Sequence, residues 1–389
     1  MKILGIETSC DDTCIAIINA RKKNGFCFDV LADVVSSQIE IHKKWGGVWP
    51  TLAKRAHQEN LVLVLKQSLK KAGEIKILKS KLEIKESKFK SLEKIFHREP
   101  ELLRSFVEFI SKLKKPKIDA LAVTRGPGLE PCLWTGINFA KALSFIWDIP
   151  LIPVNHIEAH IYANLINYSK FVFPAVCLVV SGGHTQLILM KDYGKYKILG
   201  ETRDDAAGEC LDKIARILGL EYPGGPIISK FAERFKKDVS KTKINITLPR
   251  PMIFSKNYDF SFSGLKTAVL YDFKKRSVHT QRKKEYIYQM CFEAQQAVID
   301  ILIKKTIKAV KDWRAKAIIL GGGVAANSQL QRQLIKKAKK DLPMCEIYIP
   351  PSRYCTDNAV MTAITAYFHK KEKRSWQKIK ADANLRLDR

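Results

Sequence analysis

Two histidines four residues apart, His156 and His160, are the first residues whose spacing could support metal chemistry. They lie in the segment NHIEAH, directly after the apolar strand pattern LIPV. Positions i and i+4 share one face of a helix, so both imidazoles could bind one metal ion. Two helical histidines that cap or pack would also explain the pattern. Glu158 lies about 200° around the helix from His156, so this is not the HExxH arrangement of a zinc protease.

A carboxylate in a similar setting strengthens the metal interpretation. Asp357 lies in the segment CTDN, after the strand pattern EIYIPP and before a helical pattern. The ends of strands are where α/β proteins place their ligands. Two histidines and one carboxylate leave coordination positions open, as a catalytic zinc or non-haem iron site requires. The residues alone suit either metal.

Three glycine turns could bind a phosphate group. They are Ser181–Thr185 (SGGHT), Gly224–Pro226 and Gly321–Gly323, and all three fall in the second half of the chain. Glycine leaves backbone N–H groups open to an anion, although each turn alone is explained without a ligand. None matches a Walker loop or a dinucleotide fingerprint, which excludes those two classes of nucleotide-binding protein.

Two polar residues near these turns have alternative interpretations. Asp212 lies in the helical pattern AGECLDKIARIL, where it could face a ribose hydroxyl or solvent. Asn327 follows the triple glycine at the start of another helix, where it could cap the helix or face a ligand. His57 and His184 are most simply structural histidines.

The elements that position these residues form a pattern that occurs twice. Three strand patterns open the chain (KILGIE, CIAIINA, DVLADVVSS), and three more lie within residues 175–200. Each triple is followed by a helical pattern and then by a strand that runs through a glycine loop into another helix. This duplication predicts an α/β protein of two similar lobes. We expect the boundary within residues 165–172, giving lobes of residues 1–168 and 169–389.

Residues 74–117 differ from their surroundings, because they are rich in Lys and Glu and contain almost no Gly. Apolar residues three, four or seven positions apart predict an amphipathic helix over residues 75–96, and ELLRSFVEFISKL predicts a second one. The apolar positions of the first are Ile75, Leu78, Leu82, Phe89, Leu92 and Phe96. We favour an extended helical linker with a solvated charged face over a basic arm that contacts RNA or a partner.

The composition is that of a globular chain with a large positive charge. The chain has 389 residues, of which 46% are hydrophobic, and a formal net charge of +29. This length suggests two or three domains. The charge favours nucleic acid as a partner only slightly over a lysine-rich, solvated surface. No apolar run is long enough for a membrane helix, the first residues do not resemble a signal peptide, and the nine cysteines include no CxxC. We therefore expect a cytoplasmic protein with reduced cysteines.

Together these segments closely resemble one family, the tRNA threonylcarbamoyladenosine transferases or TsaD proteins, in a bacterial-type form. The resemblance covers nearly the whole chain outside residues 74–117. The matching segments, in chain order, are IETSCDDT, GGVWPTLAKRAH, TRGPGLEPCLWTGINFAKAL, VNHIEAH, VVSGGHTQL, DDAAGECLDK, YPGGP, DFSFSGLKTA, GGGVAAN and CTDNAVM.

The resemblance implies an actin/hexokinase-like fold of two ribonuclease-H-like lobes. It implies an acyltransferase that moves the threonylcarbamoyl group from threonylcarbamoyl-AMP to N6 of the adenosine immediately 3′ of the anticodon, position 37, in tRNAs that read codons beginning with A. Its product is t6A. The implied cofactor is one divalent metal ion per subunit, with Fe²⁺ favoured and Zn²⁺ as the alternative. The implied partners are tRNA, a homologous TsaB-like protein and a TsaE-like ATPase.

The resemblance also assigns residues to roles. It implies that the metal ligands are His156, His160 and Asp357. It implies that the adenylate binds against Val179, Val180, Ser181, Gly182, Gly183, Asp212, Gly225 and Asn327. Trp49 and Thr51 depart from the family pattern, because many members have a small apolar residue and a glutamate there, and the long insertion is not typical of the family.

Three other functions fit parts of the sequence. An ATP-dependent kinase or chaperone-like ATPase shares the implied fold, but such proteins use carboxylates and Mg²⁺ and have no need of HxxxH. A metalloprotease would need a glutamate in the HExxH position, and this sequence has none there. A tRNA-binding scaffold explains the charge but gives the metal triad no role. Transfer from an activated mixed anhydride needs no enzymic nucleophile, which agrees with the absence of a Ser-His-Asp or Cys-His pattern.

Overall fold

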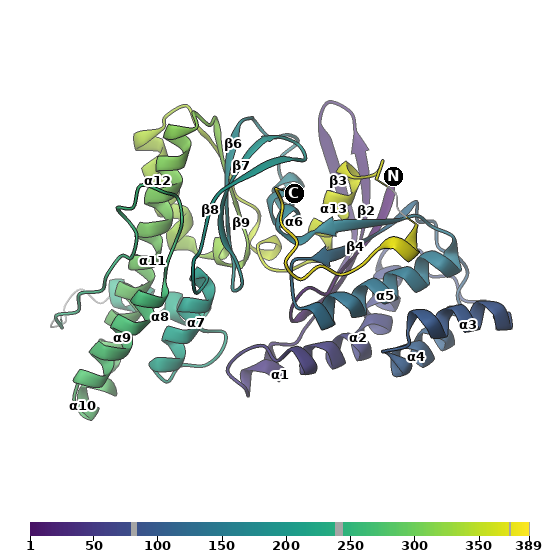
Figure 1. The fold of residues 1–389 in the computed structure, drawn as a ribbon, viewed down its shortest axis with the longest axis horizontal. Helices are drawn as coiled ribbons and strands as arrows, with labels where there is room; N and C mark the ends of the chain where they lie inside the picture. Colours follow the sequence, from purple (N-terminus) through teal and green to yellow (C-terminus); the bar gives the residue numbers. More distant parts are fainter. Residues whose placement is uncertain (79–83, 238–243, 373–374, 389) are drawn as a thin grey trace.

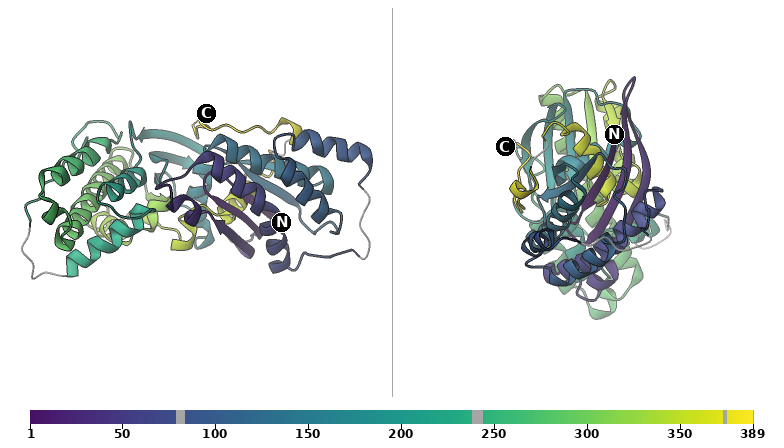
Figure 2. Two further views of the ribbon diagram at one scale, coloured as in Figure 1. Left: turned by 90° about the horizontal axis from the view of Figure 1, so that it is seen from below. Right: turned by 90° about the vertical axis from the view of Figure 1, so that its right-hand side faces the viewer.

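Two five-stranded sheets lie side by side, with most helices packed on their outer faces (Figure 1). The computed structural model describes residues 1–78, 84–237, 244–372 and 375–388. Seen from below, the molecule is elongated, with one group of helices toward each end (Figure 2). The predicted two-lobed α/β arrangement is confirmed.

The first sheet has the strand order β3-β2-β1-β4-β5. β1 pairs antiparallel with β2 and parallel with β4, and a second parallel pair joins β4 to β5. The parallel strands point their carboxyl ends to one edge, where a ligand site is expected. The strands are β1 (Lys2–Glu7), β2 (Asp12–Lys22), β3 (Phe26–Ser37), β4 (Ala120–Gly126) and β5 (Leu151–Asn155).

The second sheet repeats this order as β8-β7-β6-β9-β10, with the same alternation of antiparallel and parallel pairs. Two sheets of identical topology are the duplicated ribonuclease-H-like units of the actin/hexokinase-like fold, as predicted. Its strands are β6 (Ala175–Val180), β7 (Thr185–Asp192), β8 (Lys195–Glu201), β9 (Ala317–Gly321) and β10 (Glu346–Tyr348).

Successive side chains of a strand point to opposite faces of its sheet. The apolar side chains therefore form three clusters: one between the two sheets and one on the outer face of each sheet. In β6, Cys177 packs into the cluster between the two sheets, whereas Leu178 packs into the outer cluster of the second sheet. In β1, Ile3 faces the middle cluster and Leu4 faces the outer cluster of the first sheet. Both faces of each sheet are thus covered, which explains why these strands are almost uniformly apolar.

The helices fall into three groups according to the cluster that they join. The first sheet's outer face carries α2 (Pro50–Lys71), α3 (Glu86–Ile95), α4 (Pro100–Ile110) and α5 (Glu130–Trp147). The second sheet's outer cluster includes α7 (Ala207–Ile217), α8 (Gly224–Lys237), α9 (Ser263–Lys275), α11 (Lys284–Asp312) and α12 (Ser328–Asp341). The middle cluster contains α6 (His156–Tyr162) and α13 (Ala359–Phe368). Two short helices, α1 (Ile39–Lys43) and α10 (Val278–Gln281), lie near the surface.

The position of α13 decides where Asp357 lies. α13 follows the last strand of the second sheet, yet it packs against β1 and β2 of the first sheet. Asn358 caps the helix by accepting a hydrogen bond from the N–H of Met361 at 2.9 Å. Because the chain crosses back here, the division at residue 168 stays a proposal, with the second sheet beginning at Ala175.

The insertion differs from its prediction. Among the described residues, helix occurs only over Glu86–Ile95 and Pro100–Ile110, and Leu82 lies outside the described part. Ile77 instead forms a β-bridge with Leu113, since backbone pairing with residues 112–114 replaces helical hydrogen bonds. The expected continuous helix and extended linker are therefore wrong for this part of the chain. Leu92, Ile95, Phe96, Leu102 and Phe106 are all buried in the outer cluster of the first sheet.

Two further expectations concern cysteines and membranes. All nine cysteines are free, as predicted. Within the described ranges, no helix has both the length and the apolar character needed to cross a bilayer.

We predict that Gly5→Ala destabilises the fold at the contact that positions Asp357. A Cβ on Gly5 would lie 2.4 Å from the carbonyl oxygen of Ala359, so α13 would have to move away from β1. Overpacking of this kind costs about 1–3 kcal/mol of the free energy of unfolding. Urea denaturation followed by circular dichroism should show a lower midpoint.

Gly264→Ala, in α9, is the matched control. Its added Cβ would make only an ordinary contact with Pro251, at 3.5 Å. A helical Gly→Ala change should leave the urea midpoint equal or higher. An unchanged midpoint for Gly5→Ala would contradict the assigned contact between β1 and α13.

Candidate metal centre and substrate cleft

The histidine pair lies on the first turns of α6, immediately after β5 ends. Asn155 starts the helix by accepting hydrogen bonds from the N–H groups of Ile157 at 2.9 Å and Glu158 at 3.2 Å. His156 and His160 are both buried, and their ring centroids are 4.6 Å apart. The strand end and its cap therefore fix both imidazoles on one face of a short helix.

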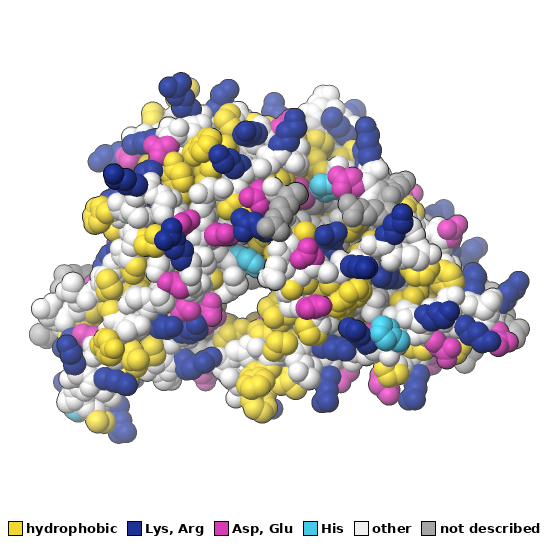
Figure 3. Space-filling view, in the orientation of Figure 1, with side chains coloured by type: hydrophobic (Ala, Val, Ile, Leu, Met, Phe, Trp, Pro, Cys, Tyr) yellow, Lys and Arg dark blue, Asp and Glu magenta, His cyan; other side chains and the backbone are white. Residues whose placement is uncertain are grey.

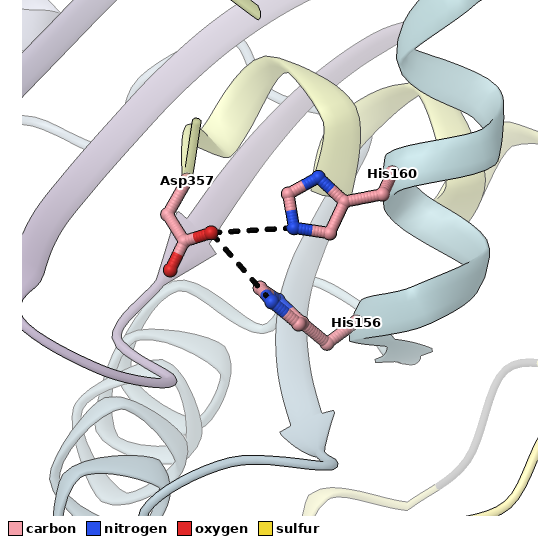
Figure 4. Close-up of side chains that lie close together, drawn as sticks. All are labelled: His156, His160 and Asp357. Atoms are coloured by element: carbon pink, nitrogen blue, oxygen red, sulfur yellow. Dashed lines mark ion pairs between the residues drawn. The ribbon is translucent and has the colours of Figure 1, made fainter. Parts of the chain in front are cut away.

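Asp357 meets the two histidines from the other side (Figure 4). Its Oδ1 lies 3.6 Å from Nε2 of His156 and 3.3 Å from Nε2 of His160. The potential ligand atoms of the three residues all lie within 4.8 Å of one another. The convergence expected from the sequence is present, and the three residues form a candidate metal site.

The electrostatics of this site favour a positive charge. Burial alone would lower the pKa of His156, but the charges of Asp357 and Glu7 outweigh it and raise the pKa to about 9. Burial raises the pKa of Asp357, yet His156 and His160 bring it down to about 2. A half-buried carboxylate that stays ionised beside two buried histidines is suited to hold a cation.

Glu7 contacts a candidate metal ligand, although its sequence position was not singled out. Its side chain is fully buried at the end of β1, and its Oε2 lies 3.2 Å from Nδ1 of His156. Ser9 Oγ lies 3.2 Å from the same nitrogen. A metal-binding histidine characteristically holds its other nitrogen against a carboxylate, which fixes the ring and the tautomer. A glutamate inside the apolar strand KILGIE was the available signal.

His160 shows how well the site fits a metal. Nδ1 of His160 has no hydrogen-bond partner among the described residues, and Nε2 faces Asp357 Oδ1 at 3.3 Å, although the residue is 1% exposed. Burial is the main cause that lowers the pKa of His160, which favours the neutral imidazole that a metal ligand needs. A buried nitrogen without a partner is costly. The 3.3 Å between Nε2 of His160 and Oδ1 of Asp357 would also let one metal ion lie about 2.0–2.2 Å from each atom.

Glu158 faces away from the three ligands, as predicted. It accepts a hydrogen bond from the hydroxyl of Tyr196 at 2.8 Å, and its other oxygen lies 2.8 Å from Nε2 of His369. These contacts tie α6 to β8 and to the end of α13. The glutamate therefore holds the metal-site helix in place and is not positioned as the base of a protease.

The glycine turns and the metal helix meet at the ends of β6 and β9. A Cβ on Gly321 would lie 2.8 Å from the carbonyl oxygen of His160, and one on Gly322 would lie 2.3 Å from that of Val180. The side chains of Val179 and Val180 are buried in the cores, so only their backbone can face a ligand. By contrast, a Cβ on Gly182 or Gly183 would meet open space.

Hydrogen bonds join the remaining predicted residues to these turns. Asp212 Oδ1 accepts from the N–H groups of Gly224 at 2.8 Å and Gly225 at 3.1 Å, at the start of α8. Asn327 caps α12, and its Nδ2 donates to Ser229 of α8 at 2.8 Å. Asn327 is therefore a cap, one of the two roles left open by the sequence, and Asp212 is occupied with the α8 backbone.

The two remaining histidines differ in their surroundings. His57 lies 2.7 Å from Thr13 Oγ1 and 3.0 Å from the Cys10 carbonyl oxygen, as expected of a structural residue. Burial and then the charges of His156 and His160 lower the pKa of His184 to about 4. His184 thus belongs to the surroundings of the metal site, which its sequence position did not indicate.

Comparison with known proteins agrees with this geometry. Residues 29–78 and 101–364 match the profile described as "TsaD: tRNA N6-adenosine threonylcarbamoyltransferase". The chain belongs to the TsaD family. Its activity is accordingly that of a tRNA N6-adenosine threonylcarbamoyltransferase, and its substrate is tRNA.

Full-length bacterial relatives support the assignment to TsaD. The enzyme of that name from Thermosipho africanus is 42% identical over 388 residues, which covers 100% of both chains. The one from Bacillus subtilis is 43% identical over 363 residues, covering 93% of this chain and 89% of the relative.

Solved structures with weaker similarity were also found. Component A of (R)-2-hydroxyglutaryl-CoA dehydratase from Acidaminococcus fermentans aligns with a TM-score of 0.46 and 14% identity, covering 96% of this chain and 100% of that one. A ROK-family protein from Streptococcus pneumoniae aligns with a TM-score of 0.48 and 12% identity, covering 96% and 99%.

We predict that His160→Ala reduces metal binding at least about a hundredfold, because it removes one of three protein ligands. Equilibrium dialysis of Fe²⁺ without oxygen, and of Zn²⁺, should measure the loss. His97→Ala, at an exposed histidine after α3, is the matched control and should bind metal as the unaltered chain does. Equal metal affinity in both variants would contradict the ligand assignment.

We also predict a pH-dependent contribution of His369 to stability. Burial lowers its pKa, but Glu158 and Glu372 outweigh burial and raise it to about 9. A histidine with a raised pKa stabilises the fold fully below its unfolded pKa of about 6.5, and this contribution disappears as the pH rises through about 9.

Thermal unfolding from pH 6 to pH 10 measures this effect. The melting temperature of His369→Gln should lie below that of the unaltered chain at about pH 6, and the difference should close near pH 10. His279→Gln, at an exposed histidine of α10, should show no such difference. A deficit for His369→Gln that is constant with pH would contradict the ion pair with Glu158.

Proposed function

We propose that the chain transfers the threonylcarbamoyl group from threonylcarbamoyl-AMP to N6 of the adenosine immediately 3′ of the anticodon, with release of AMP. The tRNAs are those that read codons beginning with A, and the product is t6A. The observation that carries this proposal is the convergence of His156, His160 and Asp357 in a member of the TsaD family. These residues lie beside glycine turns suited to a nucleotide.

The donor is an activated mixed anhydride, so the protein needs to position groups more than to supply a nucleophile. Two thiols close to Asp357 support this view. Burial and nearby carboxylates raise the pKa of Cys10 and of Cys14 well above the ordinary thiol value. Both therefore stay protonated and unreactive at neutral pH.

His156, His160 and Asp357 would hold one divalent metal ion, and Fe²⁺ is favoured by the family while Zn²⁺ suits the same ligands. When bound, such an ion polarises a carbonyl group as a Lewis acid. Glu7 and Ser9 keep Nε2 of His156 directed at the site by contacting Nδ1. Glu158 anchors α6 through Tyr196 and His369, so both histidines keep their orientation.

The adenylate would bind where the turns of the second half meet. Val179 and Val180 would contribute backbone groups, while Ser181, Gly182 and Gly183 leave room for a phosphate close to the chain. Asp212 would keep the start of α8 in place, so that Gly225, with open space around it, can approach the nucleotide. Asn327 would complete the pocket by joining α12 to α8.

Partners follow from charge and from the family. A net charge of +29 supplies attraction for the phosphates of tRNA. A TsaB-like homologue and a TsaE-like ATPase are the proposed protein partners, and the cytoplasm is the proposed compartment.

We predict that Asp357→Ala lowers threonylcarbamoyl transfer at least about a hundredfold while the protein stays folded. The change removes the only carboxylate in the described cluster of three candidate ligands. The assay incubates the unaltered chain or the variant, with purified partners, donor and tRNA, and quantifies t6A by mass spectrometry of tRNA nucleosides. A chelator should abolish product formation by the unaltered chain.

Asp388→Ala, whose carboxylate pairs with Arg386 and is not one of the three candidate ligands, is the matched control and should keep full activity. Full activity of Asp357→Ala would overturn the proposed role of the metal site. Failure of the unaltered chain to form t6A with all partners present would overturn the proposed function itself.

A further inference from the structure

Two exposed tryptophans lie on the loop between α1 and α2. Trp45 is 57% exposed and Trp49 is 52% exposed, and their ring centroids are 5.5 Å apart at an interplanar angle of 58°. Hydrophobic side chains gather over α1, beside the opening between the two halves (Figure 3). Large apolar side chains grouped on a surface characteristically mark a binding site.

The loop is held in place by the opposite half of the molecule. Lys43 forms an ion pair of 2.7 Å with Glu221, and the Arg216 guanidinium donates to the Gly46 carbonyl. The N–H of Trp49 lies 3.4 Å from Nδ1 of the buried His42. Trp45 also donates its backbone N–H to the His42 carbonyl, so hydrogen bonds hold the loop backbone before and after Trp45. The indoles are therefore preorganised, and less entropy is lost when a ligand binds.

The contacts also place this surface beside the proposed adenylate cleft. Arg216 lies one helical turn after Asp212 on α7, and it influences the pKa of that carboxyl. Glu221 lies three residues before Gly224, where α8 starts. A substrate that reaches the cleft from this side must pass the two indoles.

The charge around the loop favours RNA as the occupant. Lys43, Lys44, Arg55 and Arg216 lie on or against this segment and outnumber the acidic Glu40 and Glu221 there. The whole chain carries +29. Phosphates are attracted to such a surface, and unpaired bases stack on aromatic side chains. Sequence-tolerant stacking of this kind is how proteins hold splayed bases of RNA loops.

We propose that Trp45 and Trp49 form a stacking surface for an unpaired nucleobase of the tRNA anticodon loop, next to the adenosine that receives the threonylcarbamoyl group. The inference rests on the proposed function. An adenosine whose N6 enters the cleft must leave its stack. The base next to that adenosine then loses a stacking partner. At the rim of the cleft, the indoles would stack on this base in place of the adenosine.

The test measures binding of an anticodon stem-loop RNA that carries 2-aminopurine on either side of the target adenosine. The full chain should change the fluorescence of one of these probes, because stacking alters 2-aminopurine emission. The double variant Trp45→Ala/Trp49→Ala should bind about ten- to a hundredfold more weakly and lose that change. The double variant Trp45→Phe/Trp49→Phe should keep most of the affinity. Binding of threonylcarbamoyl-AMP should be equal in all of them.

Phe254→Ala is the matched control, because Phe254 is an aromatic residue 84% exposed on the second half. It should bind the RNA as the unaltered chain does. Equal RNA affinity in the alanine double variant would overturn the inference, even when the unaltered chain forms t6A. Loss of TsaB-like or TsaE-like partner binding with unchanged RNA affinity would also overturn it, by showing a protein interface. An unaltered chain that neither binds nor modifies tRNA would instead reject the proposed function.

Discussion

The contact of α6 with α13 between the two sheets is the constraint on which the site depends. α6 carries the histidines at the carboxyl end of a strand in the first sheet, while Asp357 arrives after the last strand of the second. The carboxylate reaches the imidazoles because the chain crosses back and packs α13 on β1 and β2. The small residues at this crossing, Gly5 and Ala359, allow the backbones to approach closely.

This arrangement concentrates negative charge where a cation would bind. Around the histidines, Glu7 is fully buried and Asp357 is half-buried. Burial and the neighbouring carboxylates raise the pKa of Asp12 to about 7. Buried like charges are costly unless a positive charge offsets them. The carboxylates that destabilise this part of the fold therefore favour binding of a cation. A bound metal cation can polarise a carbonyl group, which the transfer reaction needs.

Much of this could be predicted from the sequence because the relevant signals are local. The duplicated strand pattern reflects sheets that are buried on both faces, and the spacing of His156 and His160 is a property of any helix. The contact of Glu7 could not be derived in the same way, because it depends on the end of β1 meeting the start of α6 in the folded chain. The insertion was misjudged for a related reason: its helical periodicity was read correctly over residues 86–95, but pairing of Ile77 with Leu113 overrode it upstream.

X-ray absorption spectroscopy of the metal-loaded full chain tests the central claim most directly, with iron added without oxygen and zinc added separately. The account predicts a first coordination shell with two imidazole nitrogens and at least one carboxylate oxygen, at about 2.0–2.2 Å, and loss of one imidazole when His156 is replaced by alanine. A spectrum without imidazole ligands, or one that the replacement leaves unchanged, would contradict it.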